Sequence, residues 1–470
     1  MSQRQQNKVP KHIMIAAWAI TLGAIAPMLD ATMINIAIKQ LNETFHSQIE
    51  VTQWTITGYV LALAIAVPIA GWLINHFNGK KVFINAMLLF GITSLLAGLS
   101  WNMTALIIFR VAQGFSAGLI TTLMFTLIVK IAGREHTGKV MAIVSTPMIF
   151  GPILGPVLGG VIIHLLSWRW IFFINIIILI IAIPLMMKYI PQFEPFNSNS
   201  KLDAIGIVLL GLISTLLILG VTRLSNATHA IDMMSLVLIS LAIIFAGIYI
   251  LYNIRMNYNT ILPITLFKSK SYSAASIGLL LANIGIMGPM LIIPLYFQVF
   301  KGYSTIETAI ALIPQGVGML LTRPYIGKMI DQIGAKSVII YSIIIAMFGS
   351  IPLLFITDHT SIWIISLILF IRGCSVGGIN LGLTTDAYLG VAESNLAEAG
   401  IGINIIENVG SSVGTAIIAT VIAIIMPATH TTVSHTLTAY HAGFLVAVIA
   451  ILLIIIPALM LTSHNNKALN

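Results

Sequence analysis

Uncharged apolar runs of about twenty residues recur along almost the whole chain, and they limit its fold more than any other feature. A helical run of this length crosses a hydrocarbon core of about 30 Å. A helix also satisfies its own backbone hydrogen bonds in lipid, so each run predicts a transmembrane helix. We expect about fourteen of them, over residues 13–38, 53–75, 82–100, 104–131, 139–164, 169–190, 203–222, 232–252, 272–300, 305–329, 336–357, 361–389, 397–427 and 440–463.

The composition agrees with an all-α polytopic membrane protein. Only 8% of the 470 residues are charged and 58% are hydrophobic, whereas a soluble domain carries roughly 25% charged residues. No hydrophilic stretch is long enough for a separate soluble domain, and no nucleotide-binding loop of the form GxxxxGKS or GxxxxGKT occurs. Any transport by this chain must therefore draw its energy from an ion gradient or from the substrate's own gradient.

The formal net charge of +9 could indicate a nucleic-acid partner, but its distribution indicates membrane topology instead. With the N-terminus inside, most Lys and Arg residues fall on the cytoplasmic side. Those on the outer side are Lys39, Arg169, Arg223 and Lys301. This positive-inside bias holds only for an even number of helices. It predicts that both termini lie in the cytoplasm and gives no support to nucleic-acid binding.

The middle of the chain separates two similar sets of six helices. Residues 191–202 and 253–271 are polar, and the helices 203–222 and 232–252 between them have no interior acidic residue. The segment from Gly71 to Lys80 is related to the segment from Gly327 to Lys336. Repeated halves of this kind are typical of transporters that bind substrate between the halves near the membrane midplane.

Asp30 is an acid within the outer half of the first apolar helix. An ionisable side chain inside a span is costly and indicates a function by default. Pro27 precedes it by one turn and leaves a carbonyl without its helical partner. We interpret Asp30 as a proton-coupling or substrate-binding residue, and the alternative is an acid near the outer surface that only meets water.

A second polar feature lies on the helix 397–427. Asn404, Glu407 and Ser411 are spaced i, i+3 and i+7, so they form one stripe on that helix. We expect the stripe to face the central cavity and to bind substrate or protons. The alternative is a structural ion pair of Glu407 with Arg372 or Arg323.

The helix 139–164 contains glycines at every fourth position, which lets a neighbouring helix approach closely. Prolines in the same helix favour bending. The residues of this pattern are Gly151, Pro152, Gly155, Pro156, Gly159 and Gly160.

Four segments together carry a family resemblance. Asp30 is followed by Ala31 and Thr32, residues 110–114 read RVAQG, residues 151–160 read GPILGPVLGG, and residues 168–175 read WRWIFFIN. With the two related loops, they resemble the fourteen-helix drug:proton antiporters of the major facilitator superfamily, the EmrB/QacA type, over nearly the whole chain.

The resemblance implies a major facilitator fold with two six-helix bundles and two extra central helices. We expect the bundles at 1–190 and 272–470 and a two-helix insert with its linkers at 191–271. The resemblance also implies that the protein is a secondary active transporter and not an enzyme. It would be a proton-coupled multidrug efflux protein that works by alternating access. The alternative is an exporter of an endogenous lipid, siderophore or metabolite. A non-transporting sensor or scaffold fits the intramembrane acids less well.

The resemblance also assigns roles to residues. Arg110 belongs to the family's proton-coupling motif, although a purely structural hydrogen-bonding role stays open, and the glycine–proline pattern marks exporters. The related loops form a cytoplasmic gate whose residues are Gly71, Asn75, Gly327 and Asp331. The family usually has aspartate at the position of Asn75, so we expect the gate to depend more on Asp331.

The remaining expectations concern ligands and location. Asp30 and Glu407 suit hydrophobic cationic or zwitterionic small molecules, with protons as the coupling ion and no cofactor or metal. Asp386, near a cytoplasmic turn, is a weaker candidate for the transport path, and Ser304 to Glu307 reads as a helix capping box. We expect a functional monomer in a bacterial cytoplasmic membrane. The single cysteine, Cys374, excludes an intrachain disulfide, and we expect no zinc site at His430, His435 and His441.

Overall fold

The structure is a computed structural model that describes residues 9–47, 49–52, 54–144, 147–195, 203–226, 232–425 and 433–461. These residues form helices and connecting turns, with no strand among them. In chain order the first group of helices is α1 (Lys11–Phe45), α2 (Ile49–Thr52), α3 (Trp54–His76), α4 (Gly79–Gly98), α5 (Met103–Val144), α6 (Pro147–Leu165) and α7 (Trp170–Tyr189). The next are α8 (Ala204–Asn226) and α9 (Met233–Arg255).

The remaining helices follow the short 3-10 helix η1 (Ile264–Lys268). They are α10 (Lys270–Phe300), α11 (Thr305–Ala311), α12 (Ile313–Ile333), α13 (Ala335–Ser350), α14 (Ile362–Leu389), α15 (Leu396–Ile425), α16 (Val433–Leu453) and α17 (Ile455–Met460). Two more 3-10 helices, η2 (Ile351–Phe355) and η3 (Glu393–Asn395), lie between them.

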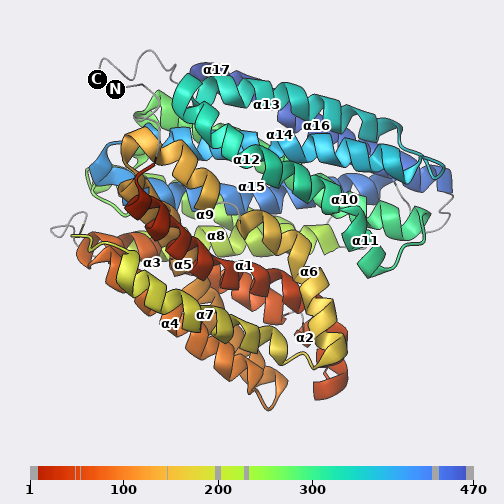
Figure 1. Cartoon of the computed structure of the whole chain (residues 1–470), viewed down its shortest axis with the longest axis horizontal. Helices are drawn as coiled ribbons and strands as arrows, with labels where there is room; N and C mark the ends of the chain where they lie inside the picture. The colour runs from red at the N-terminus through yellow and green to blue at the C-terminus, as the bar shows by residue number, and fades with distance from the viewer. Residues whose placement is uncertain are drawn as a thin grey trace. The chain divides into compact units, whose positions relative to one another are not determined.

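Contacts divide the chain into two compact units. Unit 1 contains Met1–Leu202 together with Ile326–Asp331 and Ala392–Ile401, and unit 2 contains the rest. In unit 1, α1 packs against α5, α6 and α7, while α5 also packs against α3 and α4 (Figure 1). In unit 2, α14 packs against α10 and α13, and α10 packs against α16. The ends of α12 and α15 at Ile326–Asp331 and Leu396–Ile401 thus belong to unit 1, although most of both helices belongs to unit 2.

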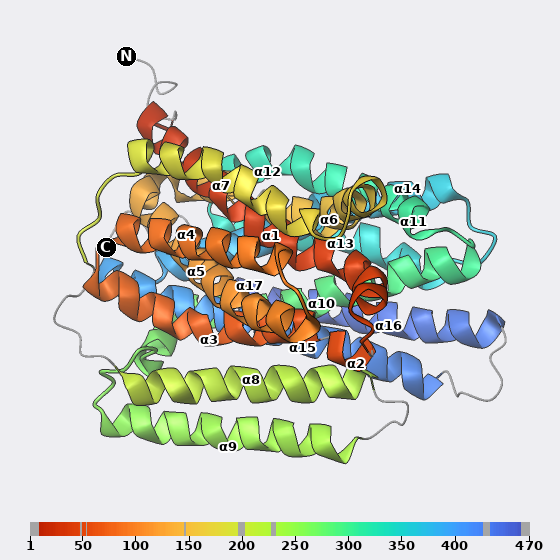
Figure 2. The same ribbon diagram turned by 90° about the horizontal axis from the view of Figure 1, so that it is seen from below.

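The two central helices form a hairpin-like pair. Figure 2 shows α8 and α9 side by side, and each packs mainly against the other among the described residues. They are assigned to unit 2. Whether residues 191–271 form a separate insert stays a prediction.

Within the described residues, eleven helices are long and apolar enough to cross a membrane. The expected spans 139–164, 272–300 and 305–329 are not among these eleven, but α6, α10 and the pair α11 and α12 occupy them. Large apolar side chains are exposed, including Trp363 at 81%, Phe355 at 74% and Met233 at 73%. Such a surface is suited to lipid, because in water it would be prone to aggregation.

The expected helix start at residue 139 is wrong, and smaller differences occur elsewhere: α1 ends at Phe45, α16 begins at Val433, and the span 305–329 is divided between α11 and α12. The helix predicted from residue 139 instead begins directly after Gly133, which breaks α5 with a φ of 62°. The physical reason is that a left-handed backbone suits glycine, which has no Cβ to clash.

Candidate functional site

Asp30 and Arg110 form an ion pair inside the first bundle. They lie on α1 and α5, and neither side chain is exposed to solvent. Arg110 Nη1 donates to Asp30 Oδ2, and it also donates to Gln113 Oε1 at 2.7 Å. Arg110 Nε donates to the backbone oxygen of Thr55 on α3 at 3.0 Å. The acid therefore has a buried basic partner 80 residues further along the chain.

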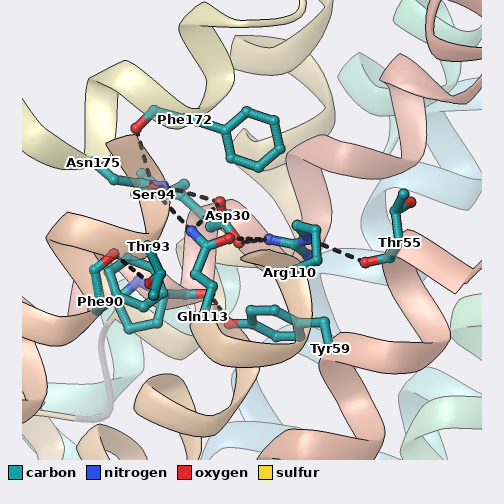
Figure 3. Close-up of polar contacts among 12 residues, drawn as sticks. Asp30, Thr55, Tyr59, Phe90, Thr93, Ser94, Arg110, Gln113, Phe172 and Asn175 are labelled. Atoms are coloured by element: carbon teal, nitrogen blue, oxygen red, sulfur yellow. Dashed lines mark hydrogen bonds and ion pairs between the residues drawn. The ribbon is translucent and has the colours of Figure 1, made fainter. Parts of the chain in front are cut away.

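Two amides and a hydroxyl complete the surroundings of the Asp30 carboxylate (Figure 3). Gln113 Nε2 and Asn175 Nδ2 both donate to Asp30 Oδ1, at 3.1 and 2.9 Å. The same two nitrogen atoms donate to Ser94 Oγ on α4, at 2.8 and 2.9 Å. Ser94 Oγ in turn donates to the backbone oxygen of Phe172 at 3.3 Å. Helices α1, α3, α4, α5 and α7 thus meet at one buried polar network.

Aromatic rings cover the guanidinium group of Arg110. Its Cζ lies 4.2 Å from the ring centroid of Tyr59 and 5.7 Å from that of Phe172. The Tyr59 hydroxyl donates to the backbone oxygen of Pro27 at 3.4 Å. A cation enclosed in this way gains from the ring electrons and has no direct contact with water. Gain or loss of the balancing charge on Asp30 would therefore change the energy of the network strongly.

The glycines of α6 lie against α1. A Cβ on Gly155 would collide with the side chain of Thr32, and one on Gly151 or Gly159 would come within 3.0 to 3.2 Å of α1 backbone oxygens. Thr32 Oγ1 donates to the oxygen of Gly151 at 2.8 Å. Gly160 has open space around it. The side chains of Pro152 and Pro156 lie outside the described part of the structure. The repeat thus allows close contact with the helix that carries Asp30.

The predicted stripe on α15 lies in unit 2. Thr384 Oγ1 on α14 donates to Glu407 Oε1 at 3.4 Å, and Ser411 Oγ donates to Asn283 Oδ1 on α10 at 3.2 Å. Glu407 and Ser411 are partly buried. Asn404 is 7% exposed, and its backbone oxygen accepts a bond from Asn408 at 2.8 Å.

Arg372 makes no ion pair with Glu407. Its Nη2 donates instead to the backbone oxygens of Gly285 and Ile286, at 3.2 and 3.4 Å. Pro289 in α10 cannot donate to the oxygen of Gly285, so Arg372 satisfies a carbonyl that the proline leaves free.

The residues expected to form the gate take part in two contacts, both within unit 1. Asn75 Nδ2 donates to Glu398 Oε1 at 2.9 Å. Asp331 accepts hydrogen bonds from the backbone N–H groups of Gly138 and Lys139, at 2.9 and 3.3 Å. Gly71 and Gly327 lie beside these contacts, close to Ile401 and Gly138 respectively.

The weaker candidates have structural partners. Glu307 Oε2 accepts bonds from the N–H and hydroxyl of Ser304, at 2.8 and 2.9 Å, so the capping box is confirmed. Asp386 is fully buried and accepts a bond from the hydroxyl of Ser271. Of the histidines considered for a zinc site, His430 and the side chain of His435 lie outside the described part of the structure.

Several site residues were missed by the sequence interpretation. Gln113 and Asn175 stood in the quoted segments RVAQG and WRWIFFIN, but no role was given to Asn175. Ser94, Tyr59 and Glu398 had no sequence signal that separates them from ordinary helix residues. Among the described residues no group of three His, Cys, Asp or Glu side chains could hold a metal ion.

A carboxylate–guanidinium pair buried among membrane-spanning helices is costly and indicates a functional site, as on the ion and substrate pathways of membrane transporters. Residues 20–417 match the family model of the Major Facilitator Superfamily, and the chain belongs to this family. It is a transporter and not an enzyme.

Bacterial multidrug resistance and multidrug export proteins are similar over most of the chain. The multidrug resistance protein B homolog of Mycobacterium tuberculosis (strain ATCC 25618 / H37Rv) is 29% identical over 403 residues, which are 85% of this chain and 74% of that protein. The multidrug export protein EmrB of Escherichia coli (strain K12) is 26% identical over 429 residues, which are 89% of this chain and 82% of that protein.

Solved structures share the fold. The human organic anion transporter MFSD10 has a TM-score of 0.63 and 11% identity, with 93% of this chain and 99% of that chain covered. The proton:xylose symporter XylE has a TM-score of 0.62 and 15% identity, with 95% and 97% covered. The expected major facilitator fold is confirmed.

Proposed function

We propose that this protein exports hydrophobic small molecules in exchange for protons, as a drug:proton antiporter working by alternating access. The buried pair of Asp30 and Arg110 is the observation that carries the proposal. Because the pair has no solvent contact, proton binding to Asp30 would leave the buried charge of Arg110 without its counter-charge and would change the free energy of this site strongly. The names of the relatives from Mycobacterium tuberculosis and Escherichia coli support drugs as the cargo.

Asp30 is the proposed proton carrier. Protonation of its Oδ2 would break the ion pair, while Gln113 and Asn175 could still donate to Oδ1. Arg110 would keep its bonds to Gln113 and to the oxygen of Thr55. The network can therefore stay together in both protonation states, and the difference between them can favour one conformation. An inward proton supplies about 2.3 kcal/mol per 100 mV of membrane potential.

The stripe on α15 is the proposed substrate-binding element. The Glu407 carboxylate could bind a cationic or zwitterionic substrate, with Asn404 and Ser411 as further polar contacts. Asp30 was also predicted to bind substrate. Because Asp30 is enclosed by Arg110, Gln113 and Asn175 in this conformation, such contact would require that network to open.

We further propose that the protein works as a monomer in a bacterial cytoplasmic membrane, with both termini in the cytoplasm. The positive-inside distribution of Lys and Arg supports this topology. Reporter fusions in the segment 428–439 should report an external position, and a fusion at residue 470 a cytoplasmic one. A cytoplasmic signal from 428–439 would overturn this topology.

Asp30→Asn tests the coupling. Asparagine keeps the approximate shape but stays neutral, so proton-driven uphill export should be abolished while substrate binding persists. Proton flux and substrate flux are measured in proteoliposomes with a cationic dye and a neutral compound. Asp232→Asn, an acid at the start of α9, is the control and should transport normally. Wild-type rate and stoichiometry in Asp30→Asn would overturn the assignment and turn attention to Asp386.

The second candidate cargo is an endogenous lipid, siderophore or metabolite. The same proteoliposomes, tested with dyes, fluoroquinolones and lipids, distinguish the two. Transport of lipids alone would favour the endogenous cargo.

A further inference from the structure

The two gate contacts are related by the internal repeat, but they differ in where the acid lies. Asn75 and Asp331 hold the same position in the segments that begin at Gly71 and Gly327. Each lies near the end of its helix, α3 or α12, and meets the beginning of another helical segment. All four contacting segments belong to unit 1.

In the contact of Asp331, the acid belongs to the repeated segment itself. Its carboxyl group accepts hydrogen bonds from the N–H groups of Gly138 and Lys139, which lie shortly after the break at Gly133. Gly138 N–H donates to one oxygen of the carboxyl group and Lys139 N–H donates to the other. Gly327 and Gly138 let the backbones meet, since a Cβ on either would lie 2.8 Å from the oxygen of the other.

In the contact of Asn75, the acid belongs to the partner helix, α15, and not to the repeated segment. Glu398 stands in the first turn of α15, where the helix dipole stabilises its charge. Asn75, which is 3% exposed, donates to it at 2.9 Å. Gly71 allows the close approach of Ile401 and Ala397. The neutral amide thus occupies the position that the acid has in the other copy.

We propose that Glu398 is a positioning residue of the cytoplasmic gate, and that each gate contact requires a single acidic side chain, which Glu398 supplies where the repeat has lost its own. A second carboxylate at residue 75 would face Glu398 across a hydrogen-bonding distance and repel it. Asn75 therefore suits Glu398, because its amide donates a hydrogen bond and carries no charge. Its presence does not mean that this contact is weaker than that of Asp331.

The inference is tested by exchanging the two side chains. Ala397, which is 1% exposed beside Glu398, is replaced by cysteine in a Cys374→Ser background, and its labelling by a maleimide is measured in inside-out vesicles without substrate. Asn75→Asp should speed labelling by about tenfold or more, because like charges at such range cost more than the 1.4 kcal/mol that equals a factor of ten. Asn75→Asp combined with Glu398→Gln should return within about twofold of the unaltered rate.

Asn78→Asp is the matched control. It adds the same charge to the same loop, but Asn78 caps α4 by accepting a bond from the N–H of Lys81, a role that aspartate performs equally well. Its labelling rate should stay unchanged. Equal rates for Asn75→Asp and Asn78→Asp, or no recovery in the double variant, would overturn the proposal.

Poor folding does not leave the proposal undecided. If Asn75→Asp fails to accumulate in the membrane, accumulation of the double variant supports the exchange, and failure of both overturns it. The measurement uses no substrate or proton gradient, so its result is independent of the proposed antiport.

Discussion

Asn175 Nδ2 lies 2.9 Å from Oδ1 of Asp30, whereas Arg110 donates to the other carboxylate oxygen, Oδ2. The amide therefore stabilises the ionised acid from α7, while the arginine does so from α5. Arg110 is thus the charged partner of Asp30 and Asn175 is a neutral one. Asn175 can be replaced without leaving a buried cation unpaired.

Asn175→Ala should lower the rate of proton-driven transport by about tenfold. The Asp30 carboxylate loses a hydrogen-bond donor in a buried network, and such a loss costs about 1–3 kcal/mol. The measurement is the transport rate in proteoliposomes under an imposed proton gradient. Asn102→Ala removes an amide that accepts a bond at the start of α5, away from Asp30, and should leave the rate unchanged. A wild-type rate in folded Asn175→Ala would contradict the role of this bond.

Gly155→Ala should destabilise the protein, whereas Gly160→Ala should not. The added Cβ at residue 155 would collide with Thr32, while residue 160 has open space. Overpacking costs about 1–3 kcal/mol, which should lower the Tm of the purified protein in detergent. Equal melting temperatures for the two variants would show that α1 and α6 are not closely packed at this point.

Glu407→Gln should weaken the binding of cationic substrates by about 1–3 kcal/mol and change the binding of neutral substrates little, because only cations use the charge. Binding is measured by fluorescence with one compound of each kind. Glu307→Gln is the control, since Glu307 caps α11 and lies outside the proposed stripe. An equal loss for both compounds would instead indicate that Glu407 supports the fold or carries protons.

The contact of Asp331 should weaken as the pH rises. Asp331 lies beyond the expected span 305–329, and burial raises its pKa to about 6 although hydrogen bonds from Gly138 and Lys139 and the charges of Lys139 and His136 act to lower it. A carboxyl with a raised pKa binds its proton more tightly while the contact is formed. Its contribution to the contact is therefore present below about pH 4 and is lost as the pH rises through about 6.

A cysteine at Ala142 measures this effect, because Ala142 packs against Gly327 and is 4% exposed. In a Cys374→Ser background, its labelling relative to a cysteine at the exposed residue Gln332 should increase between pH 5 and 7.5. Asp331→Asn should remove the dependence. The same increase in Asp331→Asn would assign the titration to another group.

Local sequence was enough to predict the helices, because apolar length and capping act within a few turns. The capping box of Ser304 and Glu307 and the close-packing glycines Gly151 and Gly155 are of this kind. The break at Gly133 was not predicted, since a glycine inside an apolar helix can remain helical and only its surroundings decide.

What the amino-acid sequence by itself determined is the class of protein, its helices and the cost of placing Asp30 and Arg110 among them, because that cost depends on residue type and on the apolar surroundings. Only the tertiary structure decided which groups meet. The bond from Asn175 to Asp30 joins residues 145 positions apart, and the bond from Asn75 to Glu398 joins residues 323 positions apart. Such pairs are selected by helix packing, which brings together side chains whose spacing along the chain carries no periodic signal.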